Sequence, residues 1–378
     1  MDNYLHIRSY ILPFLVSAAM AVTCAMLVKK WALKKEIVDR PDLAPDRKVQ
    51  SRPIPLLGGI GMYVSVLLVT LGYVLFSHRL LGGYLLPKYL IGMGLAGLFL
   101  MIGGYLDDRY HITPFKQIVW PVLASLAVVA VGIGVTYITN PFGGVVYLDK
   151  INWTIFSFHD TPYRVTLWAD LFAFAWLMGM MYTTKFLDGL DGLVSGIGVI
   201  GSVILFFLSL GKDVAQPETA LLASIVAGAC LGFLFLNFHP ARIFLGEGGS
   251  LFVGFMLGTL SIISGAKIAT ALLIMGIPIL DVAWVIVRRL FVEKKSPFST
   301  ADRKHLHFRL LDVGLSHRGV VLLLYAISIC FGAVALFSGT RQKMTALVVL
   351  VGVMVLIGAV VVYLYRKKIS TSQKNYDK

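Results

Sequence analysis

The chain has 378 residues, of which 57% are hydrophobic and only 14% are charged, and its mean hydropathy is +0.80. Soluble domains carry about 25% charged residues and must expose much of their surface to water, so this composition excludes a cytosolic enzyme, a disordered chain and a disulfide scaffold. The net charge of +14 does not indicate nucleic acid here, because basic residues of membrane proteins report loop orientation and contact with anionic lipids.

Apolar runs of about 18 or more residues are long enough to cross a bilayer as helices. Eleven such runs lie near residues 10–28, 56–77, 88–106, 117–138, 164–182, 193–211, 219–238, 249–265, 268–287, 319–339 and 343–365. We therefore predict an all-α polytopic membrane protein with one integral-membrane domain over residues 1–378. The three cysteines (Cys24, Cys230 and Cys330) lie inside these runs, which predicts buried thiols rather than disulfides or a zinc site.

The basic residues predict the orientation of these spans. The first run resembles a signal peptide at Ala19-Met20-Ala21, but Lys29 and Lys30 follow it as a stop-transfer flank would. We therefore expect a retained helix with its N-terminus outside. Alternating loops then place 25 of the 34 Lys and Arg residues on one face, which predicts that this face and the C-terminus are cytoplasmic. On the opposite face, the β-branched and aromatic loop 139–163 predicts a short outer hairpin.

Acidic residues are scarce, and most of those near the spans fall at the predicted cytoplasmic ends. Asp107 and Asp108 end the third run, Asp188 and Asp191 follow the fifth in KFLDGLDGLVSG, and Glu247 precedes the eighth in FLGEGGS. Each has a simpler alternative: a solvated helix end for the Asp pair, a plain turn for Asp188 and Asp191, and a helix cap for Glu247. If Asp188 and Asp191 form a helical turn, they share a face.

Glycines and a second group of polar residues extend this pattern. Gly246 and Gly248 flank Glu247 at a helix start, where backbone N–H groups can bind phosphate. Asp281 lies seven residues before Arg288, about 10 Å inside the ninth span. An ionisable residue there is functional by default, and a structural ion pair is the alternative. His305 and His307 alternate as they would in an extended segment.

Carboxylates beside Lys, Arg and His predict a divalent-cation site for phosphates. Mg²⁺ binds one or two carboxylates and completes its shell with phosphate oxygens and waters. Lys48, Lys116 and Lys185 in the basic loops are candidates for binding the phosphates. The reaction class that fits is phosphoryl transfer at the cytoplasmic membrane surface. The chain has no Walker A loop, no GxGxxG and no HExxH, which argues against an NTPase, a dinucleotide enzyme and a zinc protease.

The segments RKVQSRPIPLLGG, YLDDRY, FLDGLDGL, FLGEGGS, GIPILD and SPFSTADRKHLHFRLL together resemble the polyprenyl-phosphate N-acetylhexosamine-1-phosphate transferase family. That family includes the enzymes that start O-antigen and wall teichoic acid, and phospho-MurNAc-pentapeptide translocase. The resemblance implies transfer of an N-acetylhexosamine 1-phosphate, GlcNAc 1-phosphate above all, from a UDP-sugar to undecaprenyl phosphate, with release of UMP. It also implies Mg²⁺ (or Mn²⁺) as cofactor and a bacterial inner membrane with the active site on the cytoplasmic face. A homodimer is compatible with it.

The resemblance also implies roles for residues. Asp107 and Asp108 would handle the lipid phosphate or the metal, Asp188 and Asp191 would shape the nucleotide site, and Glu247 stands where the family has a metal-binding Asp. Arg303, His305 and His307 would contact the sugar nucleotide. The candidate catalytic residues are thus Asp107, Asp108, Asp188, Asp191, His305 and His307; the candidate substrate-binding residues are Lys48, Lys116, Lys185, Gly246, Gly248, Asp281 and Arg303; and the candidate metal ligands are Asp108 and Glu247.

Four positions depart from the family pattern. Lys185 replaces an Asn that can bind metal, Glu247 replaces an Asp, Phe308 replaces a third histidine, and Gln50 replaces a histidine. A protonated lysine cannot be a metal ligand. We take as a hypothesis that the first two changes compensate, with Lys185 offsetting charge near the phosphates while Glu247 keeps the metal.

Three other functions compete with this reading. A transporter or lipid-phosphate carrier would place its ionisable groups near the midplane and show internal symmetry, whereas here only Asp281 is deep. A non-catalytic scaffold would bind no Mg²⁺ and is suggested only by Lys185 and Glu247. Phospho-MurNAc-pentapeptide translocase activity is disfavoured by the HLH segment and by the predicted number of helices.

Overall fold

Most of the chain is helical, because long apolar segments in a medium without water must satisfy their backbone hydrogen bonds internally. The computed structural model describes residues 8–41, 52–77, 79–81, 83–140, 144–158, 161–212, 214–265, 268–294 and 305–376. The helices are α1 (Arg8–Lys34), α2 (Gly58–Phe76), α3 (Pro87–Tyr110), α4 (Pro114–Gln117), α5 (Val119–Ala130), α6 (Leu167–Leu187), α7 (Leu193–Leu210), α8 (Pro217–Asn237), α9 (Gly246–Ile263), α10 (Ile268–Ile274), α11 (Gly276–Val287), the π-helical turn η2 (Arg288–Val292), α12 (Leu306–Val313), α13 (His317–Phe337) and α14 (Thr340–Tyr376).

Within the described residues, eight helices are long and apolar enough to cross a membrane, and the pair α10–α11, bent by 80°, would make a ninth. The predicted count of eleven is therefore not confirmed. The two other predicted runs correspond to α5 and α6. The 12 residues of α5 span only about 18 Å at 1.5 Å per residue, well short of the roughly 30 Å hydrocarbon core.

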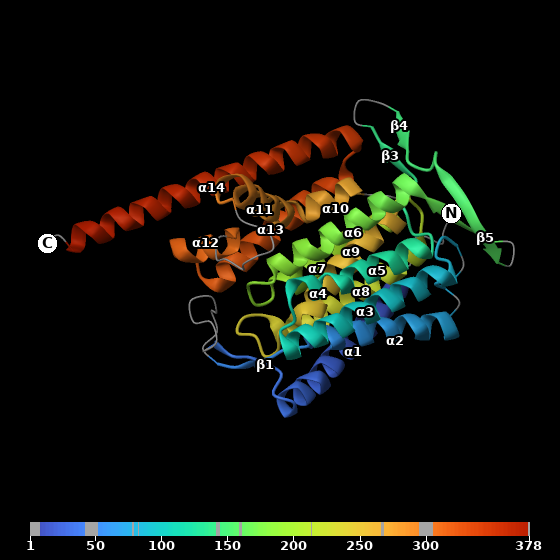
Figure 1. Ribbon diagram of the computed structural model, residues 1–378, viewed down its shortest axis with the longest axis horizontal. Coiled ribbons are helices and arrows are strands. Elements are labelled where there is room, and N and C mark those ends of the chain that lie inside the picture. The colour runs from blue at the N-terminus through green and yellow to red at the C-terminus, as the bar shows by residue number, and fades with distance from the viewer. Residues whose placement is uncertain are drawn as a thin grey trace.

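Helix α9 forms the centre of the bundle (Figure 1). It packs against α2, α3, α6 and α7, and 89% of its membrane-length window is buried, compared with 11% for α14. On one side, α1 packs against both α2 and α8. The far end of α14 extends beyond the body of the molecule. The residues that begin α9 are therefore surrounded by the ends of several helices.

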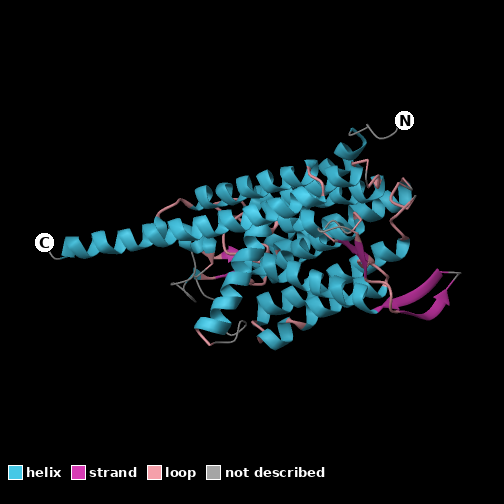
Figure 2. Cartoon of the chain, turned by 90° about the horizontal axis from the view of Figure 1, so that it is seen from above, coloured by secondary structure: helices cyan, strands magenta, loops and turns pink. Residues whose placement is uncertain are grey.

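Six short strands form three antiparallel pairs: β1 (Val38–Asp39) with β2 (Ile54–Pro55), β3 (Tyr137–Thr139) with β4 (Val145–Tyr147), and β5 (Asn152–Phe158) with β6 (Thr161–Thr166). The last two pairs occupy the segment in which one outer hairpin was expected, so the structure has two pairs there. They lie at the end of the bundle where α6 begins, and α12 lies at the other end (Figure 1). Figure 2 shows the longer strands projecting from one end of the bundle, opposite the C-terminus. The side of the membrane on which they lie stays a prediction.

The connectivity brings several functional segments to the end opposite β3–β6. Helix α6 starts beside β6 and runs for 21 residues, about 30 Å, before the Asp188 turn. Helices α3 and α8 also end there, and α9 and α13 begin there. Helix ends leave backbone groups without intrahelical partners, so this end can bind polar ligands.

Candidate active site

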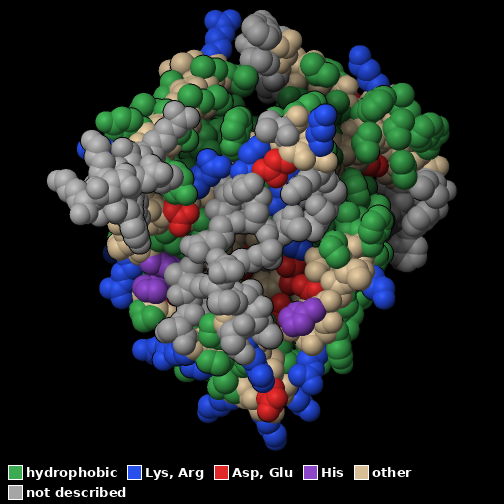
Figure 3. Space-filling view, turned by 60° about the vertical axis from the view of Figure 1, so that its left-hand side comes forward, with side chains coloured by type: hydrophobic (Ala, Val, Ile, Leu, Met, Phe, Trp, Pro, Cys, Tyr) green, Lys and Arg blue, Asp and Glu red, His purple; other side chains and the backbone are tan. Residues whose placement is uncertain are grey.

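A cavity of about 350 Å³ opens at this end of the bundle. Six residues expected in the site line it: Asp108, Lys185, Asp188, Asp191, Gly246 and Glu247. Figure 3 shows acidic side chains gathered in a hollow of this face, with histidine at its rim. These residues come from α3, from the end of α6, from the turn after α6, and from the start of α9, so the convergence expected from the sequence is present.

Asp108 lies in the last turn of α3, directly against the start of α9. Its Oδ1 accepts the backbone N–H of Glu247 at 3.2 Å, whereas its Oδ2 is buried without a hydrogen-bond partner among the described residues. Gly246 has φ +72°, and a Cβ there would collide with the Asp108 carboxylate. Only glycine therefore combines this backbone conformation with this close approach.

Close helix contacts hold α3 in this position. A Cβ on Gly104 of α3 would collide with the backbone of Gly248 in α9, so the two helices approach at the level of their backbones. Gly248 was expected to help bind phosphate. It lies against α3, where the lack of a Cβ permits this close approach of the two helices, and its binding of phosphate stays a prediction.

A polar network joins Lys185, Glu247 and Asp107. Lys185, in the last turn of α6, makes an ion pair with Glu247 in the first turn of α9. Its Nζ also donates to Gln117 Oε1 at 3.0 Å, and Gln117 Nε2 donates to Asp107 Oδ1 at 2.8 Å. Asp107 is thus connected to the cavity through Gln117, although it does not itself line the cavity. Gln117 was not predicted, and its only signal in the sequence is a polar side chain at the start of an apolar run.

Asp188 and Asp191 lie in the turn between α6 and α7, so the plain-turn alternative describes their backbone. The accessible part of Asp188 faces the cavity. Desolvation there, with the nearby Glu247 and Asp191 carboxylates, raises the pKa of Asp188 to about 7. Asp188 is therefore ionised less readily than an ordinary aspartate.

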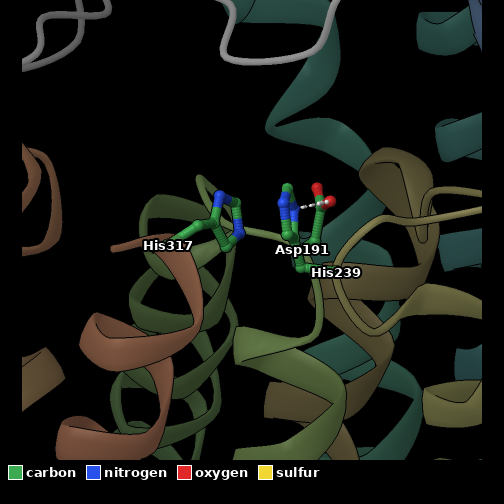
Figure 4. Close-up of side chains that lie close together, drawn as sticks. All are labelled: Asp191, His239 and His317. Carbon is green, nitrogen blue, oxygen red and sulfur yellow. Dashed lines mark hydrogen bonds and ion pairs between the residues drawn. The ribbon is translucent and has the colours of Figure 1, made fainter. Parts of the chain in front are cut away.

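Asp191 forms a cluster with two histidines, His239 and His317 (Figure 4). Its Oδ2 lies 2.8 Å from His239 Nδ1 and accepts the backbone N–H of Ala241 at 3.0 Å. The three side chains are close enough to suggest a metal site. However, the two imidazole rings are stacked 4.1 Å apart at 18°. Metal–nitrogen bonds of about 2.0–2.1 Å lie in the ring plane, so stacked rings cannot share one ion. The cluster instead holds the 239–241 loop.

Asn237 fastens this loop to the Asp188 turn. Its Oδ1 accepts from the Gly192 N–H and the Ser195 hydroxyl, and its Nδ2 donates to the Ile243 carbonyl. Asn237, His239 and His317 were also not predicted. Asn237, at the end of the seventh run, and His239, just after it, could have been found as polar residues where the chain must turn back toward Glu247.

The remaining predicted residues lie away from the cavity or outside the described residues. Asp281 is buried, and its carboxylate accepts the Leu306 N–H and contacts His305 Nδ1, both at 2.9 Å. This contact matches the structural alternative for Asp281. Lys116 is exposed at the end of α4 and does not line the cavity. Lys48 and Arg303 lie outside the described residues.

The histidine segment differs from the extended conformation expected for it. His305 is extended, but α12 begins at Leu306, so His307 lies in the first helical turn. The His305 and His307 rings are parallel, with centroids 5.7 Å apart. Burial lowers the pKa of His307 to about 3, so its ring is neutral at physiological pH. A Cβ on Gly189 would collide with this ring, and His307 therefore supports the turn that carries Asp188.

The carboxylates around Asp108 fit a divalent cation. Mg²⁺ needs only one or two protein carboxylates when phosphates and waters complete its shell. The partnerless Oδ2 of Asp108 is buried beside Glu247, and this oxygen has the chemistry that Mg²⁺ prefers. Asp108 and Glu247 are thus suitable ligands, and their role as metal ligands stays a prediction.

Comparisons with known proteins agree with this chemistry. Residues 90–265 match the model of glycosyl transferase family 4. The chain is 30% identical over 340 residues to a probable undecaprenyl-phosphate N-acetylglucosaminyl 1-phosphate transferase of Bacillus subtilis, covering 87% of this chain and 86% of that protein. It is 32% identical over 353 residues to a decaprenyl-phosphate N-acetylglucosaminephosphotransferase of Mycolicibacterium smegmatis, covering 85% and 81% of the two chains. A transferase of Thermotoga maritima, named for undecaprenyl phosphate and α-N-acetylglucosaminyl 1-phosphate, is 29% identical over 309 residues, covering 81% and 83%.

Proposed function

Because the chain belongs to the polyprenyl-phosphate N-acetylhexosamine-1-phosphate transferase family, we propose that it transfers N-acetylglucosamine 1-phosphate from UDP-GlcNAc to undecaprenyl phosphate. The products are a polyprenyl diphosphate sugar and UMP. The observation that supports this reaction best is the cavity, which combines Asp108, Asp188, Glu247 and the cation of Lys185 at one end of the helix bundle. This combination suits two phosphorylated substrates better than a solute pathway through the bundle.

The reaction is a phosphoryl transfer in which one bond replaces another. An oxygen of the lipid phosphate attacks the β-phosphorus of UDP-GlcNAc, which bears the sugar. The bond from this phosphorus to the bridging oxygen breaks, and its electron pair remains on the α-phosphate of the departing UMP. No proton has to move, so the protein contributes chiefly position and charge compensation.

The described residues can provide both contributions. Lys185 supplies positive charge toward phosphate oxygens, and Asp188 lines the cavity beside it. Gln117 holds the carboxylate of Asp107, and Asn237 holds the turn that positions Asp188. We expect Asp108 and Glu247 to hold Mg²⁺, which when bound neutralises charge on the diphosphate.

We further propose that the reaction takes place on the cytoplasmic face of a bacterial inner membrane, as the first membrane step of a cell-envelope polysaccharide. The bias of basic residues toward the cavity end supports this orientation. The nucleotide donor would then enter from the cytoplasm, and the acceptor lipid would enter from the membrane.

UMP release by the purified protein in detergent tests this function. We expect UMP from UDP-GlcNAc only when undecaprenyl phosphate is present, and at least about a hundredfold less from Asp108→Asn, since loss of a charged group in the site removes transition-state stabilisation. The matched variant Asp149→Asn changes an aspartate in the β4–β5 connection and should keep normal activity. Release only from UDP-MurNAc-pentapeptide would indicate the translocase, and no release from any UDP-sugar would overturn the proposal.

A further inference from the structure

The ion pair between Lys185 and Glu247 places an internal cation on an expected metal ligand. We infer that Lys185 competes with the divalent cation for Glu247, so that the cation binds tightly only together with the diphosphate of the donor. This inference rests on the proposed function, because it concerns how the same cavity takes up its cofactor and its nucleotide.

The ammonium of Lys185 is fully engaged where it lies. It pairs with Glu247, donates to Gln117 Oε1 at 3.0 Å and lies 5.5 Å from the centroid of the Tyr182 ring. An ammonium has three N–H donors and no acceptor, so these partners satisfy it. The side chains of Lys185 and Glu247 are only 19% and 15% exposed. Water therefore compensates poorly for a lost partner, and breaking such a shielded pair is costly.

A divalent cation and this ammonium cannot share Glu247 without strong repulsion. Mg²⁺ binds carboxylate oxygen at about 2.0–2.1 Å, and two cations within about 4 Å of each other repel in a poorly hydrated site. A cation that arrives alone must therefore displace Lys185 from Glu247. The displaced ammonium would then lose its anionic partner inside the cavity. Binding of the cation alone is consequently weak.

The diphosphate changes this balance. Its oxygens can accept hydrogen bonds from the ammonium of Lys185 while the divalent cation binds the carboxylate of Glu247. Lys185 is the only Lys or Arg among the described residues that line the cavity, so it is the cation best placed for this exchange. Binding of nucleotide and metal is thereby coupled, and thermodynamic linkage requires each to raise the affinity of the other by the same factor.

Binding of Mn²⁺ to the full-length protein in detergent, measured by electron paramagnetic resonance, tests the inference. Two variants are compared with the wild type: Lys185→Met, which removes the charge and adds no oxygen ligand, and Lys185→Gln, which adds one. Without nucleotide, we expect both variants to bind Mn²⁺ at least about tenfold more tightly than the wild type, within the usual range of coupling between ligands. Arg242→Gln removes the same charge from an exposed position and should leave the affinity unchanged.

The second arm adds UDP-GlcNAc without acceptor lipid. We expect the nucleotide to tighten Mn²⁺ binding more in the wild type than in Lys185→Met, since only the wild type has to relocate an ammonium. Equal or weaker Mn²⁺ binding by both Lys185 variants would overturn the inference, and so would a gain confined to Lys185→Gln. UMP release by the same wild-type preparation tests the proposed function separately. A failure of the proposed function can therefore be distinguished from a failure of the inference about Lys185.

Discussion

Gly246 determines how closely the backbone at the start of α9 approaches Asp108. Its φ of +72° and its contact with the carboxylate both require a residue without a Cβ. Because the unpartnered oxygen of Asp108 is held against this backbone, a small displacement there changes the geometry of the cavity floor. A substitution at Gly246 should therefore lower the activity of the protein more than it lowers the stability.

Replacement of Gly246 by Ala tests whether activity and stability are affected differently. We expect UMP release to fall at least about tenfold, since misplacing a reacting group by 1 Å can cost far more than that. Gly144→Ala is the control, because Gly144 also has positive φ but has no atom near its would-be Cβ. Both variants should lose about 1–2 kcal/mol of stability from the left-handed backbone, and Gly246→Ala should lose more because of its collision with Asp108; each loss is read as a fall in Tm. Equal activity of the two variants would contradict the assigned role of Gly246.

His307 predicts a pH dependence of stability. Burial lowers its pKa to about 3, so between pH 3 and 6.5 the unfolded chain binds a proton that the folded chain does not. The contribution of His307 to stability is therefore present above pH 6.5 and is lost as the pH falls through this window, by up to about 1.4 kcal/mol per unit. When the pH is lowered from 7.5 to 5, the Tm of the wild type should fall more than the Tm of His307→Asn, because Asn does not titrate. The exposed His111 gives the control, and an equal change for His111→Asn would refute the prediction.

At the scale of elements, α12 depends on a residue of another helix for its N-terminus. Asp281 of α11 accepts the N–H of Leu306, the first residue of α12, and also contacts His305. Side-chain oxygens normally perform this capping from within the same segment. Here one carboxylate joins α11 to the N-terminus of α12.

Removing that carboxylate should loosen α12 while leaving the bundle intact. For Asp281→Ala we expect backbone amide exchange over residues 306–313 to speed up at least about fivefold, since a lost cap costs about 1 kcal/mol. Asp281→Asn keeps an oxygen acceptor for the Leu306 N–H and should change exchange less. Hydrogen–deuterium exchange with mass spectrometry measures both. Unchanged exchange in Asp281→Ala would show that packing alone holds α12.

For the whole molecule, the distribution of basic residues predicts that the cavity end is cytoplasmic and the β3–β6 end is outside. Tyr110, at the end of α3, and Tyr147, in β4, are both exposed and lie at opposite ends. In a chain without its three native cysteines, Tyr147→Cys should react with a membrane-impermeant maleimide in intact bacterial spheroplasts. Tyr110→Cys should react only after the membrane is opened. The reverse pattern would invert the predicted topology.

The sequence predicted the class of fold and the location of most helices, because hydropathy reflects the surroundings of each segment by itself. Each predicted apolar run coincides with a described helix or with the bent pair α10–α11. Some bounds differ from the prediction: α5 is shorter than its run, and α12 was not expected as a helix. Helix length there depends on packing and caps supplied by other segments, as Asp281 does for α12.

By itself, the sequence predicted a helical membrane protein with one polar site at its helix ends, and Asp108, Lys185, Asp188, Asp191 and Glu247 are among the residues it expected there. Only the tertiary structure decided which of these residues are partners. It paired Lys185 with Glu247, linked Asp107 to Lys185 through Gln117, and placed Asp281 on α12 rather than in the cavity. The physical reason is that hydropathy and spacing act within a segment, whereas hydrogen bonds and ion pairs depend on how distant helix ends meet.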